Sequence, residues 1–173
     1  MPKQELVISR ESIQKKVREL AERISADYKG KKLVMIGVLN GAFIFLADLS
    51  RAVTIPHEID FIRVASYGSR SSSSGEITLS KDVEIDLIGK DILLVEDIVD
   101  TGTTLAWLQK QFTDKHASSV RICALIDKKE RRKSDVEVDY TGFEIERGFL
   151  IGYGLDYAEQ YRHLPEIYSL FFS

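Results

Sequence analysis

Two adjacent acids at the end of an apolar run are the residues best suited to chemistry in this sequence. Glu96 and Asp97 directly follow the apolar residues 92–95. Neighbouring carboxylates repel each other, and burying them without a partner is costly. A hard cation such as Mg²⁺, which suits one or two carboxylates together with phosphate oxygens, resolves this conflict, as does a ligand with several hydroxyl donors. The pair therefore predicts a site for Mg²⁺ or a polyhydroxyl ligand.

The turn 100–104, with the sequence Asp-Thr-Gly-Thr-Thr, follows these acids. It leads into a predicted helix, whose free N–H groups and dipole favour an anion such as a phosphate. Gly102 allows the backbone to approach a ligand closely, and the threonines add hydroxyl donors. The turn is not a Walker loop, because the chain lacks the Gly-x-x-x-x-Gly-Lys pattern. A plain helix cap is the alternative interpretation of the turn alone.

These groups need a framework, and the pattern of strands and helices predicts an α/β fold with a mostly parallel, twisted sheet flanked by helices. Ligands of such sheets bind at the carboxyl ends of the strands. The hydrophobic periodicity predicts helices over 9–29, 42–52 and 103–115, strands over 33–39, 59–65, 91–95 and 120–126, a turn over 97–102, and strand-like segments over 136–145 and 149–155.

Residues 66–75 form one segment of low complexity, with six serines in ten residues. This composition cannot build a core and predicts a mobile loop. Long loops inside compact domains are often functional lids, and a disordered linker between strands is the alternative.

The bulk composition limits the class of protein. The chain has 173 residues, 44% hydrophobic and 29% charged, with a net charge of −3. This balance fits one compact domain and favours neither nucleic acid nor a membrane as partner. Cys123 is the only cysteine, so an intrachain disulfide is excluded. The first residues lack a signal-peptide pattern, and a cytoplasmic protein is expected.

The segment 92–105 resembles the phosphoribosyl pyrophosphate (PRPP) signature of the type I phosphoribosyltransferases. Its form Val-Glu-Asp-Ile-Val-Asp-Thr-Gly is similar to the hypoxanthine–guanine branch in its short bacterial type, and the resemblance extends over about 33–165. It implies a single domain over 1–173, with a small hood built from about 1–10 and 145–173. It also implies transfer of the phosphoribosyl group of PRPP to hypoxanthine or guanine, with Mg²⁺ as cofactor, in a purine salvage enzyme that forms a homodimer or homotetramer.

The resemblance also implies roles for individual residues. In the PRPP segment, Glu96 and Asp97 would hold the ribose hydroxyls directly or through Mg²⁺, and Asp100 would be the general base near N7 of the purine. The remaining members of this segment are Ile98, Val99, Thr101, Gly102, Thr103 and Thr104, of which the last four would cradle the 5′-phosphate.

Three further groups of residues complete the implied site. Pyrophosphate would be bound by Leu39, Asn40 and Gly41, in a loop with a non-proline cis peptide, and by Arg162. The purine would be bound by Lys128, Phe149 and Leu150, and Asp156 would serve a second Mg²⁺ and the same base site. Ser66 and Tyr67 would open the flexible loop that closes over the reacting centre.

Three alternatives share the same resemblance. A related transferase could prefer xanthine, a regulatory protein could sense PRPP or nucleotides without catalysis, and a simple module could bind nucleotide without turnover. Asp100, Ser66, Tyr67 and Lys128 are all present, which favours an enzyme. Asn40, Lys129 and Leu150 depart from the residues common in the family. Taken alone, the charged run 128–133 reads as a solvated face.

Overall fold

The computed structural model describes residues 2–67 and 76–173, with the side chains of Ser66 and Tyr67 left out. The flexible loop that we predicted over 66–75 therefore falls almost entirely outside the described residues. The elements are β1 (Lys3–Ile8), α1 (Arg10–Asp27), β2 (Leu33–Leu39), α2 (Phe43–Ala52), β3 (His57–Tyr67), β4 (Glu76–Lys81), β5 (Asp91–Val99), α3 (Thr103–Asp114), β6 (Ser119–Lys128), β7 (Tyr140–Ile145), β8 (Phe149–Ile151) and β9 (Ile167–Phe171).

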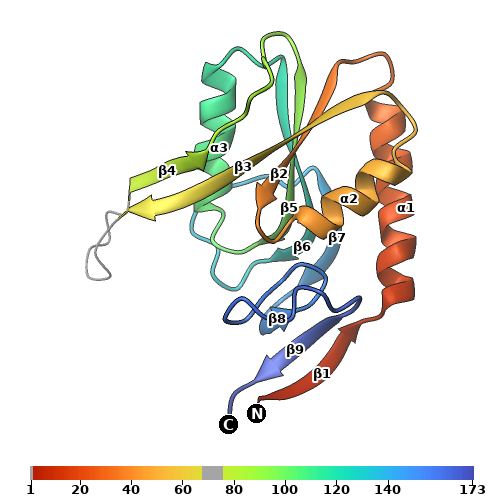
Figure 1. Ribbon diagram of the computed structural model, residues 1–173, viewed down its shortest axis with the longest axis vertical. Coiled ribbons are helices and arrows are strands. Elements are labelled where there is room, and N and C mark those ends of the chain that lie inside the picture. Colours follow the sequence, from red (N-terminus) through yellow and green to blue (C-terminus); the bar gives the residue numbers. More distant parts are fainter. Residues whose placement is uncertain (1, 68–75) are drawn as a thin grey trace.

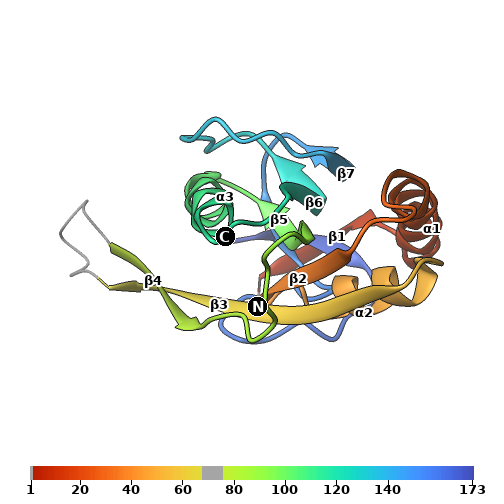
Figure 2. The same ribbon diagram turned by 90° about the horizontal axis from the view of Figure 1, so that it is seen from above.

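A six-stranded sheet in the order β4-β3-β2-β5-β6-β7 forms the body of the protein. Only β3 and β4 pair in antiparallel fashion; the other neighbours are parallel. Helices α1 and α2 cover one face, and α3 covers the other (Figures 1 and 2). The predicted α/β class, with a mostly parallel twisted sheet flanked by helices, is confirmed.

The alternation of side chains along the strands divides the core into two layers. In β2, Leu33 and Met35 join the cluster beneath α1 and α2, whereas Val34 and Ile36 join the cluster beneath α3. Strands buried on both faces are therefore apolar at every position, which explains why the run 33–39 could be recognised in the sequence.

A second sheet is built from both ends of the chain, in the order β1-β9-β8. Strand β1 pairs antiparallel with β9, so that the two termini lie close together (Figure 1). This small sheet sits at the end of the main sheet where β2 and β5 finish, and it forms the hood expected in the fold class.

Three predicted boundaries were wrong. Strand β5 continues to Val99, because its pairing with β6 persists through Val99 opposite Asp127, so the predicted turn 97–102 shrinks to its last three residues. In the segment 136–145, only Tyr140 onward pairs with β6. In 149–155, pairing with β9 ends at Ile151, and the chain then turns.

Strands β1, β4 and β9 were absent from the sequence prediction. Strand β1 is exposed along most of its length, so its residues show no buried apolar run. Its partner β9 lies at the opposite end of the chain. Pairing between such distant segments leaves no local signal, which is why β1 and β9 were missed. No helix among the described residues has the length and apolar content needed to cross a membrane.

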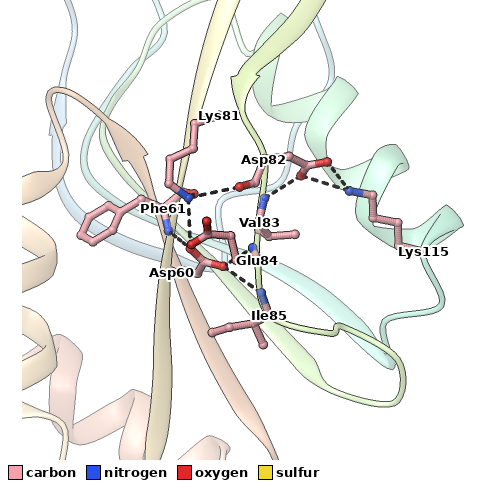
Figure 3. Close-up of polar contacts among 8 residues, drawn as sticks. All are labelled: Asp60, Phe61, Lys81, Asp82, Val83, Glu84, Ile85 and Lys115. Atoms are coloured by element: carbon pink, nitrogen blue, oxygen red, sulfur yellow. Dashed lines mark hydrogen bonds and ion pairs between the residues drawn. The ribbon is translucent and has the colours of Figure 1, made fainter.

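Asp60 anchors the chain where the β3–β4 hairpin joins β5 (Figure 3). Its buried carboxylate accepts hydrogen bonds from the backbone N–H groups of Phe61, Glu84 and Ile85 at 2.7, 2.7 and 3.1 Å, and Lys81 Nζ lies 3.4 Å away. Burial alone would raise the pKa of Asp60, but these N–H groups and the lysine lower it below its ordinary value. The carboxylate thus ties the connection 82–90 to the hairpin that carries the predicted loop.

We expect Asp60→Asn to lower the free energy of unfolding by roughly 1–3 kcal/mol at neutral pH, because a buried carboxylate loses charge-assisted hydrogen bonds. Since the folded-state pKa is lowered, this stabilisation is present above the unfolded value of about 3.9 and is lost as pH falls through the folded-state pKa. Urea unfolding at several pH values measures both effects. Glu58→Gln, which removes an exposed ion pair with Lys90, is the control and should change stability by less than about 1 kcal/mol. Equal losses in the two variants would contradict the anchoring role.

Candidate active site

A cavity of about 360 Å³ lies where β2 and β5 end. The two strands are parallel neighbours, so the residues that follow them meet at one edge of the sheet. The cavity brings together three segments that are far apart in the sequence, and it includes most of the residues predicted to bind PRPP. Its lining residues are Val38, Leu39, Gly41, Glu96, Asp97, Ile98, Val99, Asp100, Thr101, Gly102, Thr104, Leu105, Asp156 and Arg162.

Glu96 and Asp97 place two adjacent carboxyl groups at this cavity. The Asp97 N–H donates to Glu96 Oε1 at 3.2 Å, and the Ile98 N–H donates to Asp97 Oδ1 at 2.8 Å. Burial of Glu96 and the adjacent Asp97 carboxylate raise the pKa of Glu96 well above its ordinary value. Within the described part of the chain, no lysine or arginine forms an ion pair with either group.

The acid pair fits Mg²⁺ that is shared with a phosphate ligand. Among residues 2–67 and 76–173, no group of three or more His, Cys, Asp or Glu side chains is arranged to hold a metal by itself. Mg²⁺ does not require one, because it commonly keeps waters and takes one or two carboxylates together with phosphate oxygens. Two carboxylates that lack a cationic partner satisfy this requirement.

We expect Glu96→Gln to raise the melting temperature of the free protein by a few degrees while weakening ligand binding. A carboxyl group whose folded-state pKa is raised destabilises the fold at any pH above its unfolded value, about 4.3, so removing its charge is stabilising near pH 7. Calorimetric melting with and without Mg²⁺ and PRPP measures the two effects. The control is Glu22→Gln, which changes an exposed residue of α1. A lower melting temperature for Glu96→Gln would show that its charge is stabilising.

Gly41 and Gly154 let three segments approach closely around Asp97. A Cβ at Gly41 would lie 1.9 Å from Asp97 Oδ2, and one at Gly154 would lie 2.1 Å from the Gly41 carbonyl oxygen. Gly154 also has φ +98°, which disfavours other residues. The β2–α2 loop is therefore stacked between the acid pair and the segment 152–162.

The turn after β5 presents an uncapped helix end. Gly102 is the N-cap of α3 with φ 79° and has no side chain to cap the helix, and the first turn is met only by a long hydrogen bond of 3.4 Å from the Thr103 N–H to Thr101 Oγ1 among the described residues. The free N–H groups and the helix dipole make this end suitable for a phosphate. Asp100 precedes the cap; its Oδ1 is buried without a hydrogen-bond partner in the described part of the chain, while Oδ2 lies 3.4 Å from Arg131 Nη1. Asp100 thus presents, beside the cavity, one carboxylate oxygen that accepts no hydrogen bond from the described residues.

The predicted pyrophosphate residues lie at the opposite wall. The Leu39–Asn40 peptide is cis, and Asn40 is exposed. Arg162 Nη1 donates to the Gly154 carbonyl oxygen at 2.7 Å, and its Nη2 lies 3.4 Å from Asp156 Oδ1. This network orients a guanidinium toward the cavity whose other wall carries the acid pair.

Of the predicted purine residues, Asp156 lines this cavity, whereas Lys128, Phe149 and Leu150 lie outside its lining. Lys128 ends β6 one residue beyond Asp127, and its Nζ lies 3.8 Å from Glu130 Oε2. Leu150 is buried in β8. Phe149 is 44% exposed and begins β8.

Phe149 belongs to a cluster of three exposed aromatic rings. Its centroid lies 5.6 Å from that of Tyr157 and 5.8 Å from that of Phe172, both in edge-to-face geometry. An exposed aromatic cluster next to a polar cavity is suited to stacking against a planar ligand. Sequence reasoning missed Phe172, because its distance from Phe149 in the chain hides the contact.

Arg132 and Gly154 were also missed as parts of the site. The interpretation of 128–133 as a solvated face was wrong for Arg132, which pairs with the buried carboxylate of Asp127 and donates to the Asp100 carbonyl oxygen. The only signal available in the sequence was the position of this basic run directly after a strand end.

Comparison with known proteins agrees with this geometry. The family model described as "Phosphoribosyl transferase domain" matches residues 9–158. The chain is 45% identical to the hypoxanthine-guanine phosphoribosyltransferase of Bacillus subtilis, over 95% of this chain and 91% of that protein. It is 43% identical to the hypoxanthine phosphoribosyltransferase of Salmonella typhimurium, over 94% of this chain and 93% of that protein.

A solved structure supports the same relationship. The crystal structure of a hypoxanthine phosphoribosyltransferase from Staphylococcus aureus superposes with a TM-score of 0.92 at 40% identity, over 96% of this chain and 90% of that chain. The match therefore extends over nearly the whole chain. The family model and the identity to these relatives show that the chain belongs to the phosphoribosyl transferase domain family.

Proposed function

We propose that this protein is a purine salvage enzyme that transfers the phosphoribosyl group of PRPP to hypoxanthine or guanine, giving IMP or GMP and pyrophosphate. The observation that carries this proposal is the cavity in which Glu96 and Asp97, the uncapped N-terminus of α3 and the 39–41 loop face one another. These groups suit, in chemical kind, the hydroxyls, the 5′-phosphate and the pyrophosphate of PRPP. The bacterial relatives named above carry the same activity in their names.

In the proposed complex, the chain binds PRPP through three sets of groups. The carboxylates of Glu96 and Asp97 accept hydrogen bonds from the ribose hydroxyls or hold Mg²⁺, and the backbone N–H groups of 101–104 bind the 5′-phosphate. Arg162 and the backbone of the 39–41 loop bind the pyrophosphate, since Asn40 adds no charge there. When bound, Mg²⁺ would neutralise charge on the pyrophosphate leaving group; Glu96, Asp97 and Asp156 are its proposed protein contacts.

Asp100 is the proposed general base. Its Oδ1 is a buried acceptor that receives no hydrogen bond from residues 2–67 and 76–173, so a purine N7–H placed opposite it would supply one. The purine then attacks the anomeric carbon of PRPP as the bond from that carbon to pyrophosphate breaks. The N7 proton of the purine passes to Asp100. The chain contributes mainly by positioning and by charge stabilisation.

Selection of a 6-oxopurine is assigned to Lys128 and the aromatic cluster. An ammonium group only donates hydrogen bonds, so it pairs with a carbonyl oxygen and not with an amino group. Phe149 would stack on the base, and the backbone of Leu150 would contact its edge. Ser66 and Tyr67 would open the loop that closes over the site, so that water is excluded from the reacting centre.

Pyrophosphate release with PRPP and Mg²⁺, measured base by base, tests this proposal. We expect turnover with hypoxanthine or guanine and none with adenine. Turnover with xanthine alone would favour the xanthine-preferring relative. Nucleotide or PRPP binding without turnover of any base would overturn the enzymatic proposal in favour of a sensor.

We also propose a cytoplasmic homodimer or homotetramer with one domain per chain. Light scattering of the purified protein measures the number of subunits.

A further inference from the structure

Arg132 links the ends of two neighbouring strands. Strands β5 and β6 pair in parallel as far as Val99 opposite Asp127. The Arg132 side chain is 20% exposed, and its Nη2 forms an ion pair with the Asp127 carboxylate, which is 7% exposed. Its Nε donates to the Asp100 carbonyl oxygen at 3.0 Å. The Arg132 guanidinium therefore links Asp100, the first residue after β5, to Asp127 near the end of β6.

The two residues after Arg132 hold the next peptide of the same turn. The N–H groups of Lys133 and Ser134 donate to the Thr101 carbonyl oxygen at 2.9 and 3.1 Å. A Cβ at Gly102 would lie 3.1 Å from Arg132 Cδ and 3.2 Å from the Ser134 carbonyl oxygen. The turn is therefore packed directly against this segment.

The direction of these two carbonyl groups fixes the direction of two N–H groups. In a planar trans peptide, the C=O of one residue and the N–H of the next point in opposite directions. Because the carbonyls of Asp100 and Thr101 point toward the segment 132–134, the N–H groups of Thr101 and Gly102 point away from it. Both residues line the cavity, and within the described part of the chain neither N–H donates to another backbone group.

We propose that Arg132 is a positioning residue for the 5′-phosphate: by holding the Asp100 carbonyl, it aims the N–H groups of the turn into the cavity. This inference rests on the proposed function, since it assigns a phosphate to those groups. Asp127 keeps the guanidinium in place. Arg132 is partly buried behind the turn and is not part of the cavity lining, so it acts through the backbone without touching the ligand.

Binding of two probes, measured by titration calorimetry, separates positioning from general damage. Ribose 5-phosphate reports on the turn 100–104, and inorganic pyrophosphate with Mg²⁺ reports on the opposite wall. We expect Arg132→Met to weaken ribose 5-phosphate binding by about tenfold or more, as for the loss of one hydrogen bond to a charged group. The affinity of Arg132→Met for pyrophosphate should differ from that of wild type by less than about twofold, because the substitution removes no contact to the opposite wall of the cavity.

Arg132→Lys and Lys133→Ala make the test specific. A lysine can keep the ion pair with Asp127 but cannot span both partners, so Arg132→Lys should melt close to wild type and still bind ribose 5-phosphate poorly. Lys133→Ala removes a neighbouring exposed charge, keeps the backbone N–H, and should bind both probes as wild type does. Unchanged ribose 5-phosphate affinity in both Arg132 variants, or equal losses for both probes, would overturn the proposal. Pyrophosphate release by the wild type, measured alongside, reports separately on the proposed function.

Discussion

Replacing Asp100 by asparagine is expected to lower kcat by about 10²- to 10⁴-fold, the usual contribution of a positioned general base. The carboxylate Oδ1 is buried beside the cavity without a hydrogen-bond partner among the described residues. An amide of the same shape preserves the packing but accepts a proton poorly. The KM for PRPP should change little, because the backbone groups of the turn 100–104 remain in place.

Steady-state kinetics with hypoxanthine and PRPP measure this effect. Asp135→Asn, an exposed residue three positions beyond Arg132, is the matched control and should retain wild-type kcat. Melting curves of both variants exclude unfolding as the cause of a loss. A kcat within about tenfold of wild type for Asp100→Asn, below the range expected of a general base, would remove Asp100 from the role of base.

Gly41→Ala is expected to lower kcat/KM for PRPP by about 100-fold or more, a loss typical of displaced groups that position a substrate. The added Cβ would lie 1.9 Å from Asp97 Oδ2. Either the carboxylate or the loop must move, and each belongs to a different wall of the cavity. Because the clash falls within the site, its main consequence should be on binding and catalysis.

The control for this substitution is Gly30→Ala, three residues beyond the last residue of α1. Gly30 has φ +78°, but a Cβ there meets nothing within 4 Å. Gly30→Ala should therefore cost about 1 kcal/mol of stability from the backbone conformation without affecting kcat/KM. Comparable activity losses in the two variants would show that the Gly41 effect is not local to the cavity.

The sequence by itself determined the central strands and the groups at their ends. Residues 33–38 of β2 and 92–95 of β5 are buried, so they are apolar, and each apolar run is continuous in the chain. The acids 96 and 97 directly follow the apolar run of β5, and the turn 100–104 follows the strand, so their chemistry and their position near a strand end could be derived together. Local order along the chain was sufficient for both.

Only the tertiary structure decided which distant residues complete the cavity. Arg162 and Asp156 reach it because β8 and the segment 152–162 fold back over the ends of β2 and β5, and Phe172 contacts Phe149 because β9 pairs with β8. Gly154 stacks on Gly41 for the same reason. None of these contacts has a periodic signal.

Arg132 shows the same limit most clearly. In the sequence it is one charge in a basic run, which is usually solvated. In the fold, the parallel pairing of β5 and β6 places Asp127 beside the start of the turn, and the guanidinium fills the space between them. A buried strand can be recognised from the local composition of the sequence. The partners of a single side chain, by contrast, depend on which strands become neighbours in the fold.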